Sequence, residues 1–204
     1  KPQNEPEQTG IKRVTVKAPA KLPYLAMAWK VPRLKDVDHD RESFALEVLA
    51  GVLDGGDSAR LPRNLVRGRK LAQSAGAGYD GTVRGEALFM LSGQPAEGHG
   101  VTELETALRE ELRRIRDEGV KEEELARIKT QLIASQVYKR DSMMAQAMEI
   151  GHFEASGFHW RDYDKLLEKL RSVTPEEVQA VAKKYFGDDS DDRLTVAVLD
   201  PLPI

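Results

Sequence analysis

The chain has 204 residues, of which 40% are hydrophobic and 32% are charged, and it carries a net charge of −3. These values describe one globular domain with a sizeable core, without the positive charge that attracts nucleic acids or anionic membranes. The absence of cysteine excludes disulfides, thiolate nucleophiles and cysteine-ligated metals, and no apolar run approaches the roughly 20 residues of a membrane-spanning helix. We therefore expect no nucleic-acid partner and no membrane span.

The first ten residues differ in composition from the rest. Residues 1–10 read KPQNEPEQTG, a polar tract with two prolines that is typical of an interdomain linker. We interpret the chain, which starts at Lys1, as a fragment of a longer protein, with one domain over residues 11–204. The compartment stays open between periplasm and cytoplasm if the protein is bacterial, because any targeting segment would precede Lys1.

The first half of the sequence carries both strand and helix patterns. Residues 12–17 alternate, with Val14 and Val16 on one face, which predicts a half-buried strand. Tyr24 to Val31 is apolar on both faces up to Lys30 and predicts a central strand. The further elements expected in this half are a helix that ends at Gly55, a short helix over 58–70, and strands over 72–79 and 86–92.

The second half is mostly helical. Capping boxes are expected at Thr102 with Glu105 and at Thr174 with Glu177. Apolar stripes predict helices that start near residues 101, 122, 141, 160 and 174, and a last strand over 194–199. This order predicts an α+β domain with one mainly antiparallel or mixed sheet covered by helices, rather than a doubly wound repeat.

Several motifs that suggest ligands are better explained by local structure. Gly76 to Gly81 matches G-x-G-x-x-G, but these glycines lead from a strand to another strand, whereas a dinucleotide site opens a helix. Glu149 and His152 have the spacing of a di-iron ligand pair, but no second copy of this pair exists. The other histidines are isolated, so no sequence-local zinc site is predicted. An acidic cluster without the pattern of a calcium loop is formed by Asp188, Asp189, Asp191 and Asp192.

A cluster of positive charge is the stronger functional signal. Arg60, Arg63 and Arg67 are spaced i, i+3, i+7, so on an α-helix they fall within roughly 60° of each other, while Leu61 and Leu65 face the core. Arginines in such a row can hold a peptide carbonyl, a carboxylate or a transition-state anion. The alternative is pairing with acidic helix faces of the same domain, or simple solvation.

The surrounding sequence resembles the insulinase/pitrilysin family of zinc peptidases. The resemblance rests on GGDSARL at residues 55–61, NLVR at 64–67 and LA at 71–72, followed by a strand of small residues. TPEEVQAVAKKYF at residues 174–186 is similar to the end of that family's domain. The chain looks like the second half of such a peptidase, the inactive C-terminal domain that binds no zinc, over residues 11–204.

The resemblance implies a fold and a division of labour. These inverzincins have two homologous α+β halves, each resembling half of a barrel. The first half carries H-x-x-E-H and the zinc, and the second closes a chamber over an unstructured peptide. The resemblance thus implies that this fragment has no cofactor and no activity of its own, and that zinc lies in an N-terminal half or a homologous partner subunit.

The resemblance also implies substrate-binding residues but no catalytic or metal-binding residue. Arg67 matches the arginine with which the family's second half contacts substrate, and Arg60 and Arg63 extend the set. The family's tyrosine has no match here, because Gln73 and Ser74 follow Leu71-Ala72. Tyr79 is the candidate replacement, since strand alternation would put it on the face of Gln73.

Two functions remain open from the sequence. In the first, the chain is the half of an active zinc peptidase that encloses the peptide substrate. In the second, it is a non-catalytic scaffold or assembly subunit, like the core subunits of respiratory complexes and the non-catalytic partners of processing peptidases. An H-x-x-E-H motif upstream of Lys1 would favour the first.

Overall fold

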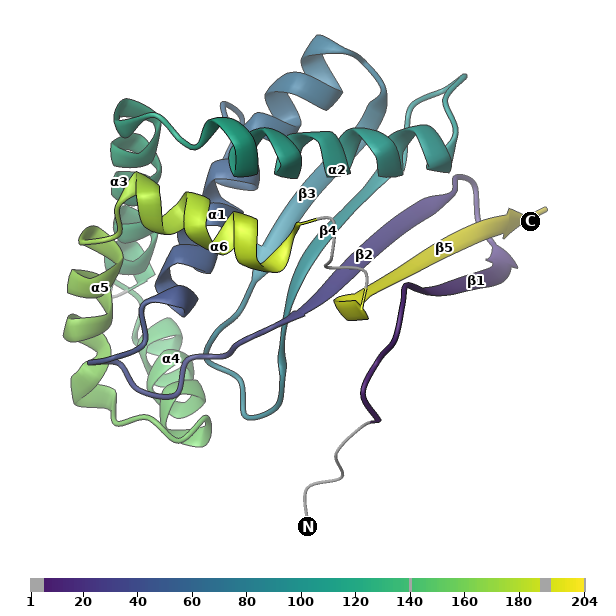
Figure 1. The fold of residues 1–204 in the computed structure, drawn as a ribbon. Helices are drawn as coiled ribbons and strands as arrows, with labels where there is room; N and C mark the ends of the chain where they lie inside the picture. Colours follow the sequence, from purple (N-terminus) through teal and green to yellow (C-terminus); the bar gives the residue numbers. More distant parts are fainter. Residues whose placement is uncertain (1–5, 140, 188–191, 204) are drawn as a thin grey trace.

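A five-stranded sheet forms the centre of the protein. The computed structural model describes residues 6–139, 141–187 and 192–203 (Figure 1). The strand order of the sheet is β1-β5-β2-β4-β3, and among the described strands only β1 and β5 pair in parallel. The strands are β1 (Lys12–Pro19), β2 (Tyr24–Val31), β3 (Ala72–Tyr79), β4 (Ala87–Pro95) and β5 (Leu194–Leu202). The predicted mixed sheet is confirmed, and β2 lies at its centre as expected.

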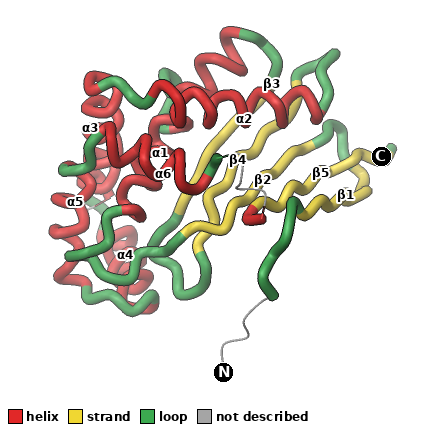
Figure 2. Tube along the Cα trace, viewed as in Figure 1, coloured by secondary structure: helices red, strands yellow, loops and turns green. Residues whose placement is uncertain are grey.

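The helices lie on one side of this sheet (Figure 2). Six are α-helices, η1 is a π-helix and η2 is a turn of 3₁₀-helix, among the residues that the structure describes. Their bounds are α1 (Glu42–Asp54), η1 (Pro62–Gly68), α2 (Val101–Glu118), α3 (Glu122–Lys139), α4 (Met143–Ala155), η2 (Trp160–Asp162), α5 (Tyr163–Arg171) and α6 (Pro175–Tyr185). No helix of the described chain is both long and apolar enough to cross a membrane.

The core lies between the sheet and these helices. The β2 side chains that face the helices, Leu25, Met27 and Trp29, are buried. Cross-strand pairing places Phe89 of β4 opposite Trp29, and the rings of both pack on Phe186, at centroid distances of 4.8 Å and 5.3 Å respectively. The segment after α6 therefore closes the core over the central strands.

Strand β1 departs from the sequence prediction. The face of β1 that carries Val14 and Val16 was expected to be buried, but in this chain these side chains are exposed, at 48% and 51%. Their polar neighbour Arg13 points to the helix side and donates two hydrogen bonds to Glu105 of α2, at 2.8 and 2.9 Å. The apolar side of β1 therefore faces away from the helices.

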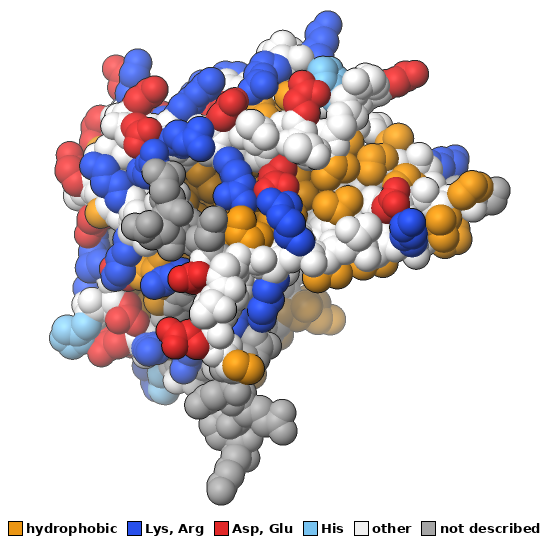
Figure 3. Space-filling view, turned by 45° about the vertical axis from the view of Figure 1, so that its right-hand side comes forward, with side chains coloured by type: hydrophobic (Ala, Val, Ile, Leu, Met, Phe, Trp, Pro, Cys, Tyr) orange, Lys and Arg blue, Asp and Glu red, His pale blue; other side chains and the backbone are white. Residues whose placement is uncertain are grey.

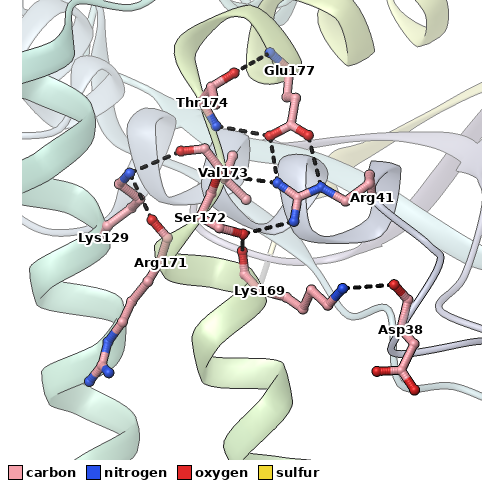
Figure 4. Close-up of polar contacts among 9 residues, drawn as sticks. All are labelled: Asp38, Arg41, Lys129, Lys169, Arg171, Ser172, Val173, Thr174 and Glu177. Carbon is pink, nitrogen blue, oxygen red and sulfur yellow. Dashed lines mark hydrogen bonds and ion pairs between the residues drawn. The ribbon is translucent and has the colours of Figure 1, made fainter.

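A polar cluster fixes the turn between α5 and α6 (Figure 4). Thr174 and Glu177 form the predicted capping box at the start of α6. The Glu177 carboxylate also accepts two hydrogen bonds of 2.8 Å from Arg41, which precedes α1. Lys129 of α3 donates to the backbone carbonyls of the turn, at 3.0 and 2.9 Å. Helices α1, α3 and α6 are thus joined at one point.

The second predicted capping box is not formed. Helix α2 begins after Gly100 without a side-chain cap, and Glu105 instead accepts hydrogen bonds from Arg13 and Arg109. Two guanidinium groups are stronger partners for a carboxylate than one backbone N–H. These contacts hold the pKa of Glu105 below its ordinary value, against the opposing effect of burial.

Candidate functional site

The segment between α1 and β3 carries the predicted arginines in an unexpected helix type. Over η1 the backbone bonds run from residue i+5 to residue i, so the Arg69 N–H donates to the Asn64 carbonyl at 2.8 Å. The expected α-helical row of Arg60, Arg63 and Arg67 is therefore wrong, because a π-helix turns less per residue and Arg60 precedes it. Leu61 and Leu65 are fully buried, as predicted.

Arg60 points inward and holds the first turn of α3. Its guanidinium donates to both carboxylate oxygens of Glu124, at 3.0 and 2.8 Å, and to the Gly119 carbonyl at 3.2 Å. The two side chains are only 12% and 14% exposed. Burial raises the pKa of Glu124, but the hydrogen bonds and charge of Arg60 outweigh it and leave this pKa lowered. Arg60 is thus paired with an acidic helix end of the same domain.

Arg63 and Arg67 instead lie on the surface of η1. The Arg63 guanidinium donates to the side-chain oxygen of the neighbouring Asn64 at 3.1 Å, and Arg67 donates to the Asp57 carbonyl in the turn after α1. Within the described chain neither forms an ion pair with a carboxylate, and Lys70 beside them is also exposed without one. These three residues, which we call the cationic ridge, leave guanidinium and ammonium donors for an external acceptor.

The ridge is held against α2 by its inward neighbours. The Asn64 amide donates to the fully buried Glu111 carboxylate at 2.8 Å, and Arg69 pairs with Glu110 at 2.9 Å. Arg114 gives Glu111 a second donor at 3.0 Å. Because the Glu111 carboxylate is fully buried and accepts from both Asn64 and Arg114, it fixes the position of η1 on α2.

Beside η1, strand β3 forms an edge of the sheet. Among the strands that the structure describes it pairs only with β4, and both α1 and η1 pack against it. Apart from Gln73 and Tyr79, its residues are alanine, serine and glycine, so its own side chains leave most of its backbone uncovered. The Ala77 N–H points away from β4 and donates to Asp54 at 3.2 Å. Residues two apart share this direction, so Ala75 also turns its backbone groups outward.

Asp54 lies at this edge, although sequence analysis did not select it. Burial raises the pKa of its carboxyl, and the hydrogen bond from Ala77 opposes that rise. Its carboxylate also comes close to Gly76, where a side chain would approach it to 2.9 Å. Asp54 follows the last apolar residues of α1. No local sequence pattern predicts its contact with β3, which comes after η1 in the chain.

Tyr79 lies on the face of β3 that the helices cover. Its hydroxyl donates to the Pro32 carbonyl at 2.8 Å and its ring stacks on Phe89. Burial raises the pKa of this phenol. The expected shared face with Gln73 is wrong, because the pairing with β4 shifts register between Ala72 and Ser74 and interrupts the alternation.

The remaining motifs do not assemble a site. Gly76 and Gly78 lie within β3, as expected. Glu149 accepts from Tyr163 at 3.3 Å, whereas His152 lies 3.1 Å from the Thr82 hydroxyl, so the pair does not converge. The described residues contain no group of three histidine or carboxylate side chains that could hold a metal ion, so their donor set does not fit zinc. Asp188, Asp189 and Asp191 lie outside the described residues.

The fold and this surface define a class of protein: an α+β domain whose described residues hold no metal site, with cations beside the edge strand of its sheet. The model of the peptidase M16 inactive domain matches residues 1–132, and the chain belongs to that family. An uncharacterized zinc protease of Streptomyces coelicolor is 29% identical over 164 residues, which are 80% of this chain and 34% of that protein. The chain therefore spans about a third of that relative's length.

Solved structures share the fold at low sequence identity. A protease from Helicobacter pylori superposes with a TM-score of 0.84 at 20% identity, over 96% of this chain and 46% of that one. The inactive peptidase domain of a candidate zinc protease from Bordetella parapertussis gives 0.76 at 19% identity, over 93% and 96%. A chain of complex III₂ from Candida albicans gives 0.75 at 15% identity, over 94% and 46%. The predicted family and fold class are confirmed.

Proposed function

We propose that this chain is the non-metal-binding half of a zinc peptidase and that it closes a chamber over an extended peptide substrate. Zinc would be held by an N-terminal half or by a homologous partner subunit. Family membership supports the division into halves. The length of the relatives supports it too, because this chain spans 34% of the Streptomyces coelicolor protein and 46% of the Helicobacter pylori chain.

One observation carries the proposal: the open edge of β3 lies beside the cationic ridge. An extended peptide can add a strand to such an edge, with its own backbone groups bonded to those of Ala75. The small side chains of β3 leave room for this approach. Recognition of the backbone rather than of side chains suits a site that accepts unstructured peptides of varied sequence.

The cationic ridge gives this edge a second kind of donor. Arg67 and Arg63 would bind peptide carbonyls or carboxylates next to the edge, since a guanidinium presents several N–H groups in a fixed plane. Arg60 and Tyr79 already have partners inside the domain. We therefore place substrate binding on Arg67 and Arg63 and assign packing roles to the other two.

The direct test is Arg67→Ala in the full-length protein, or in the assembly that carries the zinc. We expect kcat/KM for an extended peptide to fall about tenfold or more, as when a charge-assisted hydrogen bond is lost. Arg171→Ala is the matched control, because Arg171 is an exposed residue at the end of α5 and its guanidinium points away from the other labelled residues in Figure 4. An unchanged kcat/KM for Arg67→Ala would remove this residue from the site.

The edge itself is tested by Ala75→Pro. Proline removes an N–H that points away from β4, so the sheet keeps its ladder while the peptide loses one bond. We expect KM to rise about fivefold, the effect of one hydrogen bond. Ala75→Ser keeps the N–H and should leave KM unchanged; equal effects of the two changes would argue against binding at the edge.

A second function follows from the respiratory neighbour. The Candida albicans complex III₂ chain shares this fold with a TM-score of 0.75, so a scaffold or assembly role is the alternative. Zinc analysis of the full-length protein separates the two functions. One equivalent of zinc with zinc-dependent peptide cleavage supports the peptidase, and a stable complex without either supports the scaffold.

A further inference from the structure

Lys70 has an unusual backbone conformation at the junction between η1 and β3. Its φ angle is 51°, and in the described chain it is the only residue other than glycine with a positive φ angle. Glycine adopts this left-handed conformation at no steric cost, whereas the β-carbon of a lysine crowds the neighbouring backbone. A lysine in such a position indicates a role for its side chain.

The segment around Lys70 carries an excess of positive charge. Residues 58–72 contain four arginines and one lysine but no acidic residue. Arg60 and Arg69 have carboxylate partners on α3 and α2, which leaves the cationic ridge without one in the described chain. On the helical surface at the left of Figure 3, by contrast, acidic and basic side chains are interspersed. The ridge therefore attracts a negatively charged group from outside the domain.

The cationic ridge lies at the start of β3. The Leu71 N–H donates to the Leu65 carbonyl at 2.9 Å, which ties η1 to the residues that lead into the strand. Lys70 comes two residues before Ala72, where β3 begins, so the two Cα atoms are at most about 7 Å apart. The outward backbone groups of Ala75 lie further along the same edge.

A carboxylate lies beyond Ala75 on this edge. Asp54 accepts a hydrogen bond from the Ala77 N–H at 3.2 Å. Positive charge is thus found where the edge begins, and negative charge two residues past Ala75. A peptide carboxylate near this edge is attracted to the cationic ridge and repelled by Asp54.

Strand polarity turns this charge arrangement into a direction for the peptide. A peptide that pairs with Ala75 in the antiparallel sense runs toward the ridge with its C-terminal side, and a parallel one with its N-terminal side. Antiparallel pairing is also the slightly more stable of the two. The chain from Ala75 to Lys70 spans at most roughly 17 Å, so the ridge is within reach of about five peptide residues.

We propose that the cationic ridge binds a carboxylate on the C-terminal side of the peptide segment that pairs with β3, and that Lys70 is a specificity-determining residue for this contact. The inference rests on the proposed function and names its substrate class. Substrates would be extended peptides, bound antiparallel to β3, with an aspartate, a glutamate or a free C-terminus at that distance. Lysine and arginine side chains offer only donors, which suits a carboxylate.

Peptide cleavage by the full-length protein, or by the assembly that carries the zinc, tests the substrate class. The peptides share one extended sequence, hold glutamate or glutamine at one varied position, and end in a free or amidated C-terminus. We expect kcat/KM to be about tenfold higher for glutamate than for glutamine at a position on the C-terminal side. A preference for the free C-terminus alone would identify the terminal carboxylate as the bound group.

Two negative results have different meanings. Zinc-dependent cleavage with no preference for either kind of carboxylate would keep the proposed function and overturn this inference. Absence of zinc-dependent cleavage of every peptide would remove the proposed function and this inference with it.

Lys70→Gly tests the lysine itself. Glycine fits the positive φ angle, so thermal unfolding should show a domain at least as stable as wild type. The ratio of kcat/KM between glutamate and glutamine peptides should fall about threefold, and Lys70→Arg, which keeps the charge, should restore it. Lys35→Gly is the control, because Lys35 is exposed and precedes the opposite end of α1. A ratio that Lys70→Gly leaves unchanged would overturn the assignment of Lys70.

Photo-cross-linking in zinc-free full-length protein tests the direction of the peptide. A photoreactive benzoylphenylalanine on the C-terminal side of the peptide should link to residues 63–70, and the same group on the N-terminal side should link near Asp54. Mass spectrometry of the digested product locates both links. The reverse pattern, or no link at either end, would overturn the antiparallel arrangement.

Discussion

Arg60 and Glu124 join the segment after α1 to the first turn of α3 through a two-bond fork that is almost closed to solvent. The two residues lie 64 positions apart, and each carboxylate oxygen accepts one guanidinium N–H. Arg60 also donates to the Gly119 carbonyl at the end of α2. This one side chain therefore fixes the start of η1 relative to two helices.

Replacement of Arg60 by alanine should destabilise the domain by about 2–4 kcal/mol, because it leaves the Glu124 charge in a poorly solvated place. Urea unfolding measures this loss. Arg63→Ala, which removes an exposed side chain from the same segment, should change stability by no more than about 0.5 kcal/mol. If the fork acts as a unit, Arg60→Ala and Glu124→Ala together will cost less than the sum of the two single changes.

The Arg41–Glu177 contact predicts a pH dependence. The hydrogen bonds from Arg41 lower the pKa of Glu177 below 4.5, with burial opposing them. A lowered folded-state pKa means that the stabilisation is complete above about pH 4.5 and is lost as the pH falls through the folded value. Glu177→Gln should therefore be less stable than wild type at pH 7, and the difference should shrink in acid.

Thr174→Ala is the control for this pH effect. It removes the uncharged partner of the same capping box and should cost about 1 kcal/mol. Because threonine does not titrate, that cost should stay largely constant between pH 7 and pH 4. A Glu177→Gln difference that is equally constant would show that its charge does not stabilise the fold.

Leu65 belongs to η1, and its side chain is fully buried in the core. Leu65→Ala should reduce the free energy of unfolding by about 2–5 kcal/mol, through lost apolar contact and a remaining cavity. Thermal unfolding and peptide cleavage, measured on the same sample, separate this effect from that of Arg67→Ala. The leucine change should act on stability first, and the arginine change on kcat/KM alone.

Two glycines inside helices should respond in opposite directions to alanine. A β-carbon at Gly51 of α1 would lie 2.7 Å from the Ile128 Cγ2 atom of α3, so Gly51→Ala should cost about 1–3 kcal/mol. At Gly151 of α4 no atom lies within 4 Å of such a carbon. Gly151→Ala should stabilise by about 0.5–1 kcal/mol, since alanine is the better helix former. A gain at both positions would show that α1 and α3 can separate at no cost.

The elements of the fold could be predicted because their signals are local. Apolar spacing located the helices, and the capping box at Thr174 formed because its partners are three residues apart. The equivalent prediction at Thr102 failed, because Glu105 is bound by Arg13 from another strand. A local pattern holds only where no stronger distant partner competes for the same group.

The candidate site was less accessible to such reasoning. The sequence placed Arg67, Arg63 and Arg60 in one segment, but it could not show that Arg60 pairs with Glu124 or that η1 is a π-helix. Nor could it locate the register shift between Ala72 and Ser74, which puts Gln73 and Tyr79 on different faces of β3. The ion pair, the helix type and the strand register all depend on how neighbouring elements pack against this segment.

The sequence by itself determined the family, the order of strands and helices, and the segment with the cations, since residue type and spacing encode all three. Only the tertiary structure decided which cations of the described chain lack a carboxylate partner and which side of β1 the helices cover. Both depend on contacts between residues far apart in the chain. The burial of an ion pair and the register of two strands cannot be predicted from the spacing of residues within one segment.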